Sequence, residues 1–313
     1  MNILTLTVFQ RIRVKTTVYF GPGAIAKIDG IIESLKARGI TQILCMTGGR
    51  SYKLTGAWDH VEAACKKHGV GITLYNKVTP NPTTTAIDEA VSIARKDGAK
   101  AVIGIGGGSP IDAGKSAAVL LAYPDKTAEE LYTFKFTPDH AVPVIAINLT
   151  HGTGTEVNRF AVATIPHLNF KPAIAYDCIY PEYSIDDPAL MTKLAANQTR
   201  YVSIDAVNHV IEAATSVAAN PLSIAFGVET IRLVAKYLPK AIENPEDVKA
   251  RYALLYASMI AGSAFDNGLL HYTHALEHPL SGMKPDLTHG LGLSILLPAV
   301  ILECYPCEGK SFR

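Results

Sequence analysis

The first part of the chain alternates between short apolar segments and longer segments with helical periodicity, and this alternation constrains the fold most strongly. β-Branched and aromatic residues predict strands at residues 14–20, 41–46, 71–75, 101–105 and 142–148. Between them, apolar residues at helical spacing predict helices at residues 26–36, 61–67, 85–96 and 110–121. Such alternation is typical of a mostly parallel sheet with helices on both faces. The sequence therefore predicts a doubly wound α/β domain.

The pattern changes near Asp186. Beyond this residue strand signals fade, and long helical patterns occupy residues 201–216, 222–240 and 245–264. We therefore expect an α/β domain at residues 1–186 and an all-α domain at residues 187–313. A length of 313 residues accommodates two domains of ordinary size.

Composition and charge exclude several classes of protein. The 29 Lys and Arg residues nearly balance the 28 Asp and Glu residues, so the net charge of +1 favours neither nucleic acid nor an anionic membrane. Five cysteines in a chain of this length do not form a disulfide framework, and the N-terminal charges follow the apolar stretch instead of preceding it as in a secretory signal. No apolar run approaches the ~20 residues of a membrane span. We expect a cytoplasmic protein with no nucleic-acid or membrane partner.

A glycine-rich turn follows the predicted strand at residues 101–105. Gly106, Gly107 and Gly108 allow close backbone approach to an anion, Ser109 can donate a hydrogen bond, and Pro110 suits the first position of a helix. The free N–H groups and dipole of such a helix favour a phosphate. The turn matches neither the P-loop spacing nor the Gly-x-Gly-x-x-Gly fingerprint. A tight turn without a ligand is the alternative, and we favour a pyrophosphate site.

Histidines cluster in the C-terminal part. Positions 271–289 hold four of the ten histidines, and His274 and His278 lie four residues apart, which places both on one face of a helix. Asp205 and His209 repeat this spacing on an earlier predicted helix. One carboxylate with several imidazoles forms a ligand set for a divalent first-row metal. Any one histidine alone is more simply explained as a core or surface residue, but two same-face pairs and a cluster together favour a metal site.

These features lie among segments that occur in one order along the chain: FGPG at residues 20–23, GGGSPID at 106–112 with Lys115, GTGTE at 152–156, DAVNH at 205–209, HALEHPL at 274–280 and THG at 288–290. In this order the segments resemble the iron-containing (group III) alcohol dehydrogenase family. The resemblance implies a dinucleotide-binding α/β domain followed by an all-α metal-binding domain, as in dehydroquinate synthase-like proteins. Family members continue for several tens of residues beyond the last segment, so we expect a truncated helical domain.

The resemblance also assigns site residues. It implies that Asp205, His209, His274 and His289 bind the metal, with Fe²⁺ favoured and Zn²⁺ allowed by the ligand types. It makes His278 an unligated histidine between metal and nicotinamide, and it places Asp112 at the reaction cleft. We therefore predict catalytic roles for His278 and Asp112.

The predicted nucleotide-binding residues come from the glycine-rich turn, from the loop after the second strand and from positions that the family uses. They are Gly48, Gly49, Ser51, Asn81, Gly106, Gly107, Gly108, Ser109, Thr150, Thr153 and Lys171. NAD-specific family members usually carry an acidic residue where this chain has Gly48, and that residue would repel a 2′-phosphate. Arg50, Ser51 and Lys53 follow, so we predict a preference for NADP(H) over NAD(H). Equal binding of both is the alternative.

Together these features predict a metal-dependent NAD(P)-linked alcohol dehydrogenase or aldehyde reductase, which is expected to act on a small alcohol or aldehyde as a homodimer or higher homo-oligomer. Three alternatives stay open. A metal-dependent hydrolase would use the same ligands to activate water, although the nucleotide turn disfavours it. A zinc polyol dehydrogenase similar to glycerol dehydrogenase would share the scaffold. A truncated paralogue would bind the nucleotide without turnover.

Overall fold

A computed structural model describes residues 11–284 and 286–304, and its centre is a six-stranded sheet in which every paired strand is parallel. The strands are β1 (Thr17–Phe20), β2 (Gln42–Thr47), β3 (Gly71–Tyr75), β4 (Val102–Gly106), β5 (Val144–Asn148) and β8 (Tyr183–Asp186). Their order across the sheet is β1-β8-β5-β4-β2-β3. Since β3 and β4 lie on opposite sides of β2, the winding reverses at the boundary between β2 and β4. Ligands of doubly wound sheets bind at the carboxyl ends of strands at such a point.

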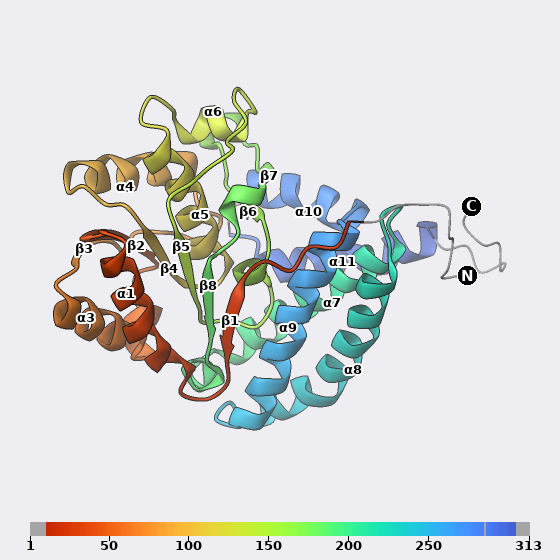
Figure 1. Ribbon diagram of the computed structural model, residues 1–313. Helices are drawn as coiled ribbons and strands as arrows, with labels where there is room; N and C mark the ends of the chain where they lie inside the picture. Colours follow the sequence, from red (N-terminus) through yellow and green to blue (C-terminus); the bar gives the residue numbers. More distant parts are fainter. Residues whose placement is uncertain (1–10, 285, 305–313) are drawn as a thin grey trace.

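Helices cover both faces of the sheet (Figure 1). Side chains alternate along β2, so Ile43 and Cys45 pack with α1 (Ile28–Ala37) and α3 (Ala57–His68), in one of two apolar cores. Leu44 and Met46 point to the opposite face. There they join the core formed by α4 (Thr84–Lys96), α5 (Gly108–Ala122) and α6 (Ala128–Tyr132). This arrangement explains why the central strands read as continuous apolar runs.

The second part is helical. It comprises α7 (Ala196–Thr215), α8 (Pro221–Glu243), α9 (Val248–Gly268), α10 (Tyr272–Met283) and α11 (His289–Cys304). Small and apolar side chains of α7 and α9 meet in a core that includes Ala206, Val210, Ala261 and Phe265. Within the described residues, no helix is both long and apolar enough to cross a bilayer. The predicted α/β domain followed by an all-α domain is confirmed.

Several details differ from the prediction, and helices α3 and α7 begin four and five residues earlier than expected. β1 begins at Thr17, three residues later than expected, and β8 was not predicted because its four residues follow Pro181 and include Ser184 and Asp186. The antiparallel pair β6 (Phe160–Val162) and β7 (Ala173–Ala175) was also missed. Segments of three or four residues are too short for periodicity to distinguish a strand from a loop.

The helical part meets the α/β part at two glycines. A Cβ atom added to Gly262 of α9 would lie 2.7 Å from Gly154 Cα, and Gly154 itself has a left-handed φ of 59°. Replacing Gly262 with alanine is therefore expected to lower the free energy of unfolding by about 2 kcal/mol, since the backbones must separate. Urea denaturation followed by circular dichroism measures this loss.

Gly30 provides a matched control for Gly262→Ala. It is an exposed glycine inside helix α1, and a Cβ atom added there would meet nothing within 4 Å. Gly30→Ala should therefore stabilise the protein by about 0.5–1 kcal/mol. Equal effects of the two substitutions would refute the contact at Gly262.

Candidate active site

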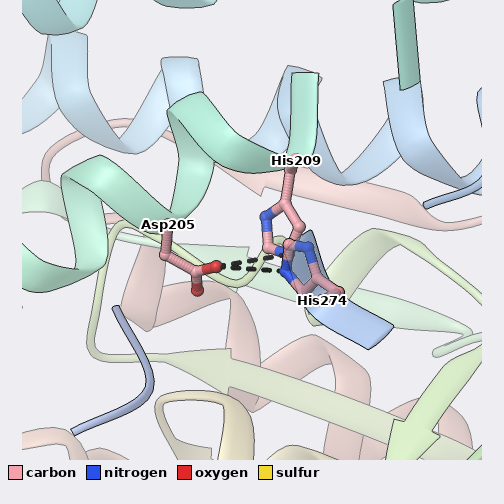
Figure 2. Close-up of side chains that lie close together, drawn as sticks. All are labelled: Asp205, His209 and His274. Carbon is pink, nitrogen blue, oxygen red and sulfur yellow. Dashed lines mark ion pairs between the residues drawn. The ribbon is translucent and has the colours of Figure 1, made fainter. Parts of the chain in front are cut away.

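Three imidazoles converge on one carboxylate oxygen. Helix α7 supplies Asp205 and His209 from one face, α10 supplies His274, and His289 is the first residue of α11. The Nε2 atoms of His209, His274 and His289 lie 3.4, 3.6 and 3.8 Å from Asp205 Oδ1. Figure 2 shows Asp205, His209 and His274 with their facing atoms. Ligand atoms of Asp205, His209 and His274 all lie within 4.8 Å of one another, and His289 approaches this group through Asp205. The four predicted ligands thus come together from three helices.

The geometry of these atoms fits a metal ion. Asp205 Oδ1 and His274 Nε2 are buried and have no hydrogen-bond partner, although each is close to another polar atom. Ligands at about 2.1 Å from a tetrahedral ion lie about 3.4 Å from one another, close to the observed separations. A buried polar atom without a partner costs free energy, which a bound cation would offset. We conclude that the residues fit a divalent metal.

Two buried glutamates orient the histidines, and sequence reasoning missed both. Glu212 Oε2 lies 2.9 Å from His274 Nδ1, and Glu212 also accepts hydrogen bonds from the backbone N–H groups of His271 and His274 at the start of α10. Glu277 Oε2 hydrogen-bonds His289 Nδ1. A carboxylate on the far ring nitrogen fixes the ring orientation and makes Nε2 more basic. The spacing of Glu212, seven residues after Asp205 on α7, was a signal that could have been used.

Burial and the facing carboxylates shift the titration of these groups. Burial lowers the pKa of His209 to about 4. At His274 burial also lowers the pKa, but the nearby carboxylates of Asp205 and Glu212 prevail and raise its pKa to about 9. Burial opposes the shift at Glu212 as well, where the hydrogen bond with His274 lowers the pKa to about 2. Burial opposes the same shift at Asp205, where the neighbouring histidines lower the pKa, so both carboxylates are ionised at neutral pH and Asp205 is available to a cation.

His278 lies one helical turn beyond His274. Its ring centre is 6.0 Å from that of His274 and 5.4 Å from that of His289. Burial, together with the positive charges of His289 and Lys171, lowers the pKa of His278 well below its usual value. A neutral imidazole beside the metal ligands can accept or donate a proton. This position agrees with the predicted unligated role, which stays a prediction.

The glycine-rich turn joins β4 to α5 at the reversal point of the sheet. Cβ atoms added to Gly107 and Gly108 would lie 2.8 Å from Thr150 Oγ1 and from Thr153 Cγ2 respectively. These glycines therefore pack directly against the two threonines that were predicted to bind the nucleotide. Gly107 is the N-cap residue of α5 and offers no side-chain cap, which leaves the first N–H groups of the helix available to an anion.

The other predicted nucleotide-binding residues are dispersed. Gly48 and Gly49 follow β2, whose last residue, Thr47, pairs with Ile105 just before the glycine-rich turn. Ser51 is exposed at the start of the short helix α2 (Ser51–Leu54). Asn81 adopts a left-handed φ of 56° in the loop before α4. Lys171 lies elsewhere, with its Nζ atom 3.8 Å from Glu277 Oε2 beside the metal ligands.

Asp112 anchors the segment around the β6–β7 pair. Its two carboxylate oxygens accept hydrogen bonds from Thr155 Oγ1 at 2.6 Å and from the backbone N–H of Val162 at 3.0 Å. The fully buried Lys115 donates to the carbonyl oxygens of Thr155, Asn158 and Phe160. Asp112 therefore contacts the side chain of Thr155 and the backbone of Val162, and its catalytic role stays a prediction.

Comparisons with known proteins agree with this architecture. Residues 15–188 match the family described as iron-containing alcohol dehydrogenase, and residues 199–310 match its C-terminal family. A long-chain primary alcohol dehydrogenase, AdhA, from Thermoanaerobacter ethanolicus is 62% identical over 94% of this chain and 74% of its own length. A 1,3-propanediol dehydrogenase from Citrobacter freundii is 34% identical over 90% of this chain and 72% of its own length.

Solved structures support the same assignment. The NADH-dependent butanol dehydrogenase A of Thermotoga maritima superposes with a TM-score of 0.87 at 31% identity, over 97% of this chain and 80% of that one. An iron-containing alcohol dehydrogenase from the same organism has a TM-score of 0.86 at 30% identity, over 94% of this chain and 80% of that one. The chain therefore belongs to the iron-containing alcohol dehydrogenase family.

Proposed function

We propose that this chain, a metal-dependent alcohol dehydrogenase, interconverts a primary alcohol with an apolar chain and the corresponding aldehyde. The observation that carries the proposal is the convergence of three imidazole Nε2 atoms on Asp205 Oδ1. When bound there, Fe²⁺, or Zn²⁺ as the alternative, would supply Lewis acidity toward the substrate oxygen. Asp205, His209, His274 and His289 would hold the ion.

The loop of residues 150–153 contacts both the glycine-rich turn and the helix that carries Asp205. This contact supports hydride transfer between a nucleotide and a substrate held at fixed positions. Thr150 and Thr153 pack on Gly107 and Gly108 at one end. A Cβ atom on Gly152 would lie 2.5 Å from Val202 Cβ, on the helix that carries Asp205. We infer that the turn binds the pyrophosphate and that His278 relays a proton or positions the nicotinamide. Close packing between the sites preserves the short approach that hydride transfer requires.

The proposed substrate class rests on the apolar wall beside the metal ligands. Phe265 is 4% exposed, and its ring stacks on that of His209 with centroids 4.4 Å apart. Gly262, on the same helix as Phe265, contacts Gly154. The similar AdhA is named a long-chain primary alcohol dehydrogenase, in agreement with an apolar chain. Rates with aldehydes of two to ten carbons test this: kcat/KM should rise with chain length, and preference for a polyol substrate would contradict it.

We also propose that the enzyme prefers NADP(H). Gly48 occupies the position after β2 where an acidic residue would repel a 2′-phosphate, and Arg50, Ser51 and Lys53 are exposed beside it. Gly48→Asp is therefore expected to shift the ratio of kcat/KM values toward NADH by about tenfold, since an unfavourable charge contact of about 1.4 kcal/mol suffices. Steady-state kinetics with both cofactors measure it. A higher wild-type kcat/KM for NADH than for NADPH would overturn the proposal.

Three further proposals concern context. We propose a division between the domains after Asp186, where the last strand of the sheet ends. From the balanced charge and the family resemblance we propose a cytoplasmic homodimer or higher homo-oligomer, with no nucleic-acid or membrane partner. Light scattering of the purified protein tests the oligomeric state.

A further inference from the structure

One carboxylate oxygen beside the metal ligands has two competing partners. Glu277 Oε2 hydrogen-bonds His289 Nδ1 and also lies 3.8 Å from Lys171 Nζ. The side chains of Glu277 and Lys171 are 0% and 5% exposed, so little water screens the pair. The other oxygen of Glu277 accepts from Ser281 Oγ, which holds the carboxylate in place.

Glu212 offers an internal comparison. It holds His274 as Glu277 holds His289, through a carboxylate on Nδ1, and it is equally buried. Its remaining hydrogen bonds come from backbone N–H groups of His271 and His274, and among the described residues no lysine or arginine forms an ion pair with it. The two histidines therefore differ in that a lysine faces the carboxylate behind His289, whereas among the described residues no lysine or arginine pairs with the carboxylate behind His274.

We propose that Glu277 is a positioning residue that strengthens the metal ligand His289, and that Lys171 weakens this effect by sharing the same carboxylate oxygen. The proposal rests on the metal-binding role of His289 in the proposed function. A carboxylate hydrogen-bonded to Nδ1 makes Nε2 a better donor to a metal. A lysine beside that carboxylate neutralises part of its charge and also repels a cation nearby. Glu277 and Lys171 should therefore affect metal affinity in opposite directions.

A purely structural role for the ion pair predicts a different result. If Lys171 only compensated the buried charge of Glu277, then its removal would disturb the site and weaken metal binding. The sign of the effect of Lys171→Met on metal affinity separates the two accounts. Lys171→Arg retains the positive charge. If that charge is what weakens metal binding, then the metal affinity of Lys171→Arg should equal that of the wild type.

The test is titration of the metal-free full chain with Co²⁺ against a competing chelator, in the absence of nucleotide. We expect Glu277→Gln to weaken Co²⁺ binding by about 10–100-fold. Lys171→Met should tighten it by at least about threefold, and Lys171→Arg should leave it near the wild-type value. Weaker or unchanged Co²⁺ binding in Lys171→Met would overturn the proposal. This measurement does not depend on whether Glu277→Gln folds.

Glu212→Gln provides the matched control. Combined with Lys171→Met, its effect on Co²⁺ affinity should be additive, whereas Glu277→Gln with Lys171→Met should depart from additivity by more than about threefold. Additivity in both pairs of substitutions would contradict the claim that Lys171 acts through the carboxylate of Glu277. Because these titrations use metal alone, absence of turnover would refute the proposed function without changing their outcome.

Discussion

Replacing His274 with alanine is expected to remove the metal and to lower kcat with NADPH and an aldehyde by at least about 10³-fold. Nε2 of His274 faces Asp205 Oδ1, and Nδ1 interacts with Glu212. Both ring nitrogens therefore fix the imidazole with Nε2 directed at the proposed metal site. Loss of a Lewis acid removes several kcal/mol of transition-state stabilisation. Metal analysis after dialysis, together with steady-state rates, measures both effects.

Nucleotide binding should survive the substitution at His274. The glycine-rich turn packs against Thr150 and Thr153, which belong to a different part of the molecule, so the Kd for NADPH should change by less than about threefold. His271→Ala is the matched control, because His271 is the N-cap residue of the same helix and contacts Glu212 only through its backbone N–H group. Full metal occupancy in His274→Ala would show that His274 is not a ligand.

Replacing His278 with alanine is expected to lower kcat by about 10²-fold while leaving the metal bound, because a general acid–base group contributes about that much. The lowered pKa of His278 keeps its imidazole neutral at physiological pH, so its ring can accept a proton. Its ring centre lies 5.4 Å from that of His289. This distance is short enough for His278 to exchange a proton with a substrate bound at the proposed metal site. Metal analysis and steady-state rates on the same sample check both statements.

Loss of the metal in His278→Ala would contradict this role. It would make His278 a ligand and His274 its neighbour, since both lie on one face of α10. His278→Asn keeps a polar side chain of smaller size, and it should retain the metal and show a similar loss of rate.

The sheet and the long helices could be predicted because their residues repeat at fixed spacing. β3 and the helix of residues 84–96 were expected to within one residue, and the i, i+4 pair Asp205 and His209 does lie on one side of α7. The order of the strands could not be read from any local pattern, since pairing joins residues such as Phe20 and Asp186 that are far apart in sequence. The strand β8 was missed for a different reason, since its four residues are too few to show a periodicity.

The set of residues proposed to bind the metal could be named from their spacing and the family resemblance, whereas the two glutamates behind them were missed. Glu212 and Glu277 read as ordinary helical glutamates, because burial and the facing histidines arise only when α7, α10 and α11 pack together. Lys171 was expected on the cofactor side, and its contact with Glu277 spans about a hundred residues of sequence. Asp112 was expected at the cleft, yet the unforeseen β6–β7 pair supplies one of its partners, Val162.

Turnover by metal-free and metal-loaded enzyme tests the central claim most directly. Oxidation of NADPH should be followed with a long-chain aldehyde while Fe²⁺ is added anaerobically to the metal-free chain, with Zn²⁺ in a parallel series. Activity should be negligible without metal and should rise to a plateau at one equivalent per chain, because the four converging ligands form one site. An equal rate in the metal-free and metal-loaded enzyme would contradict this account.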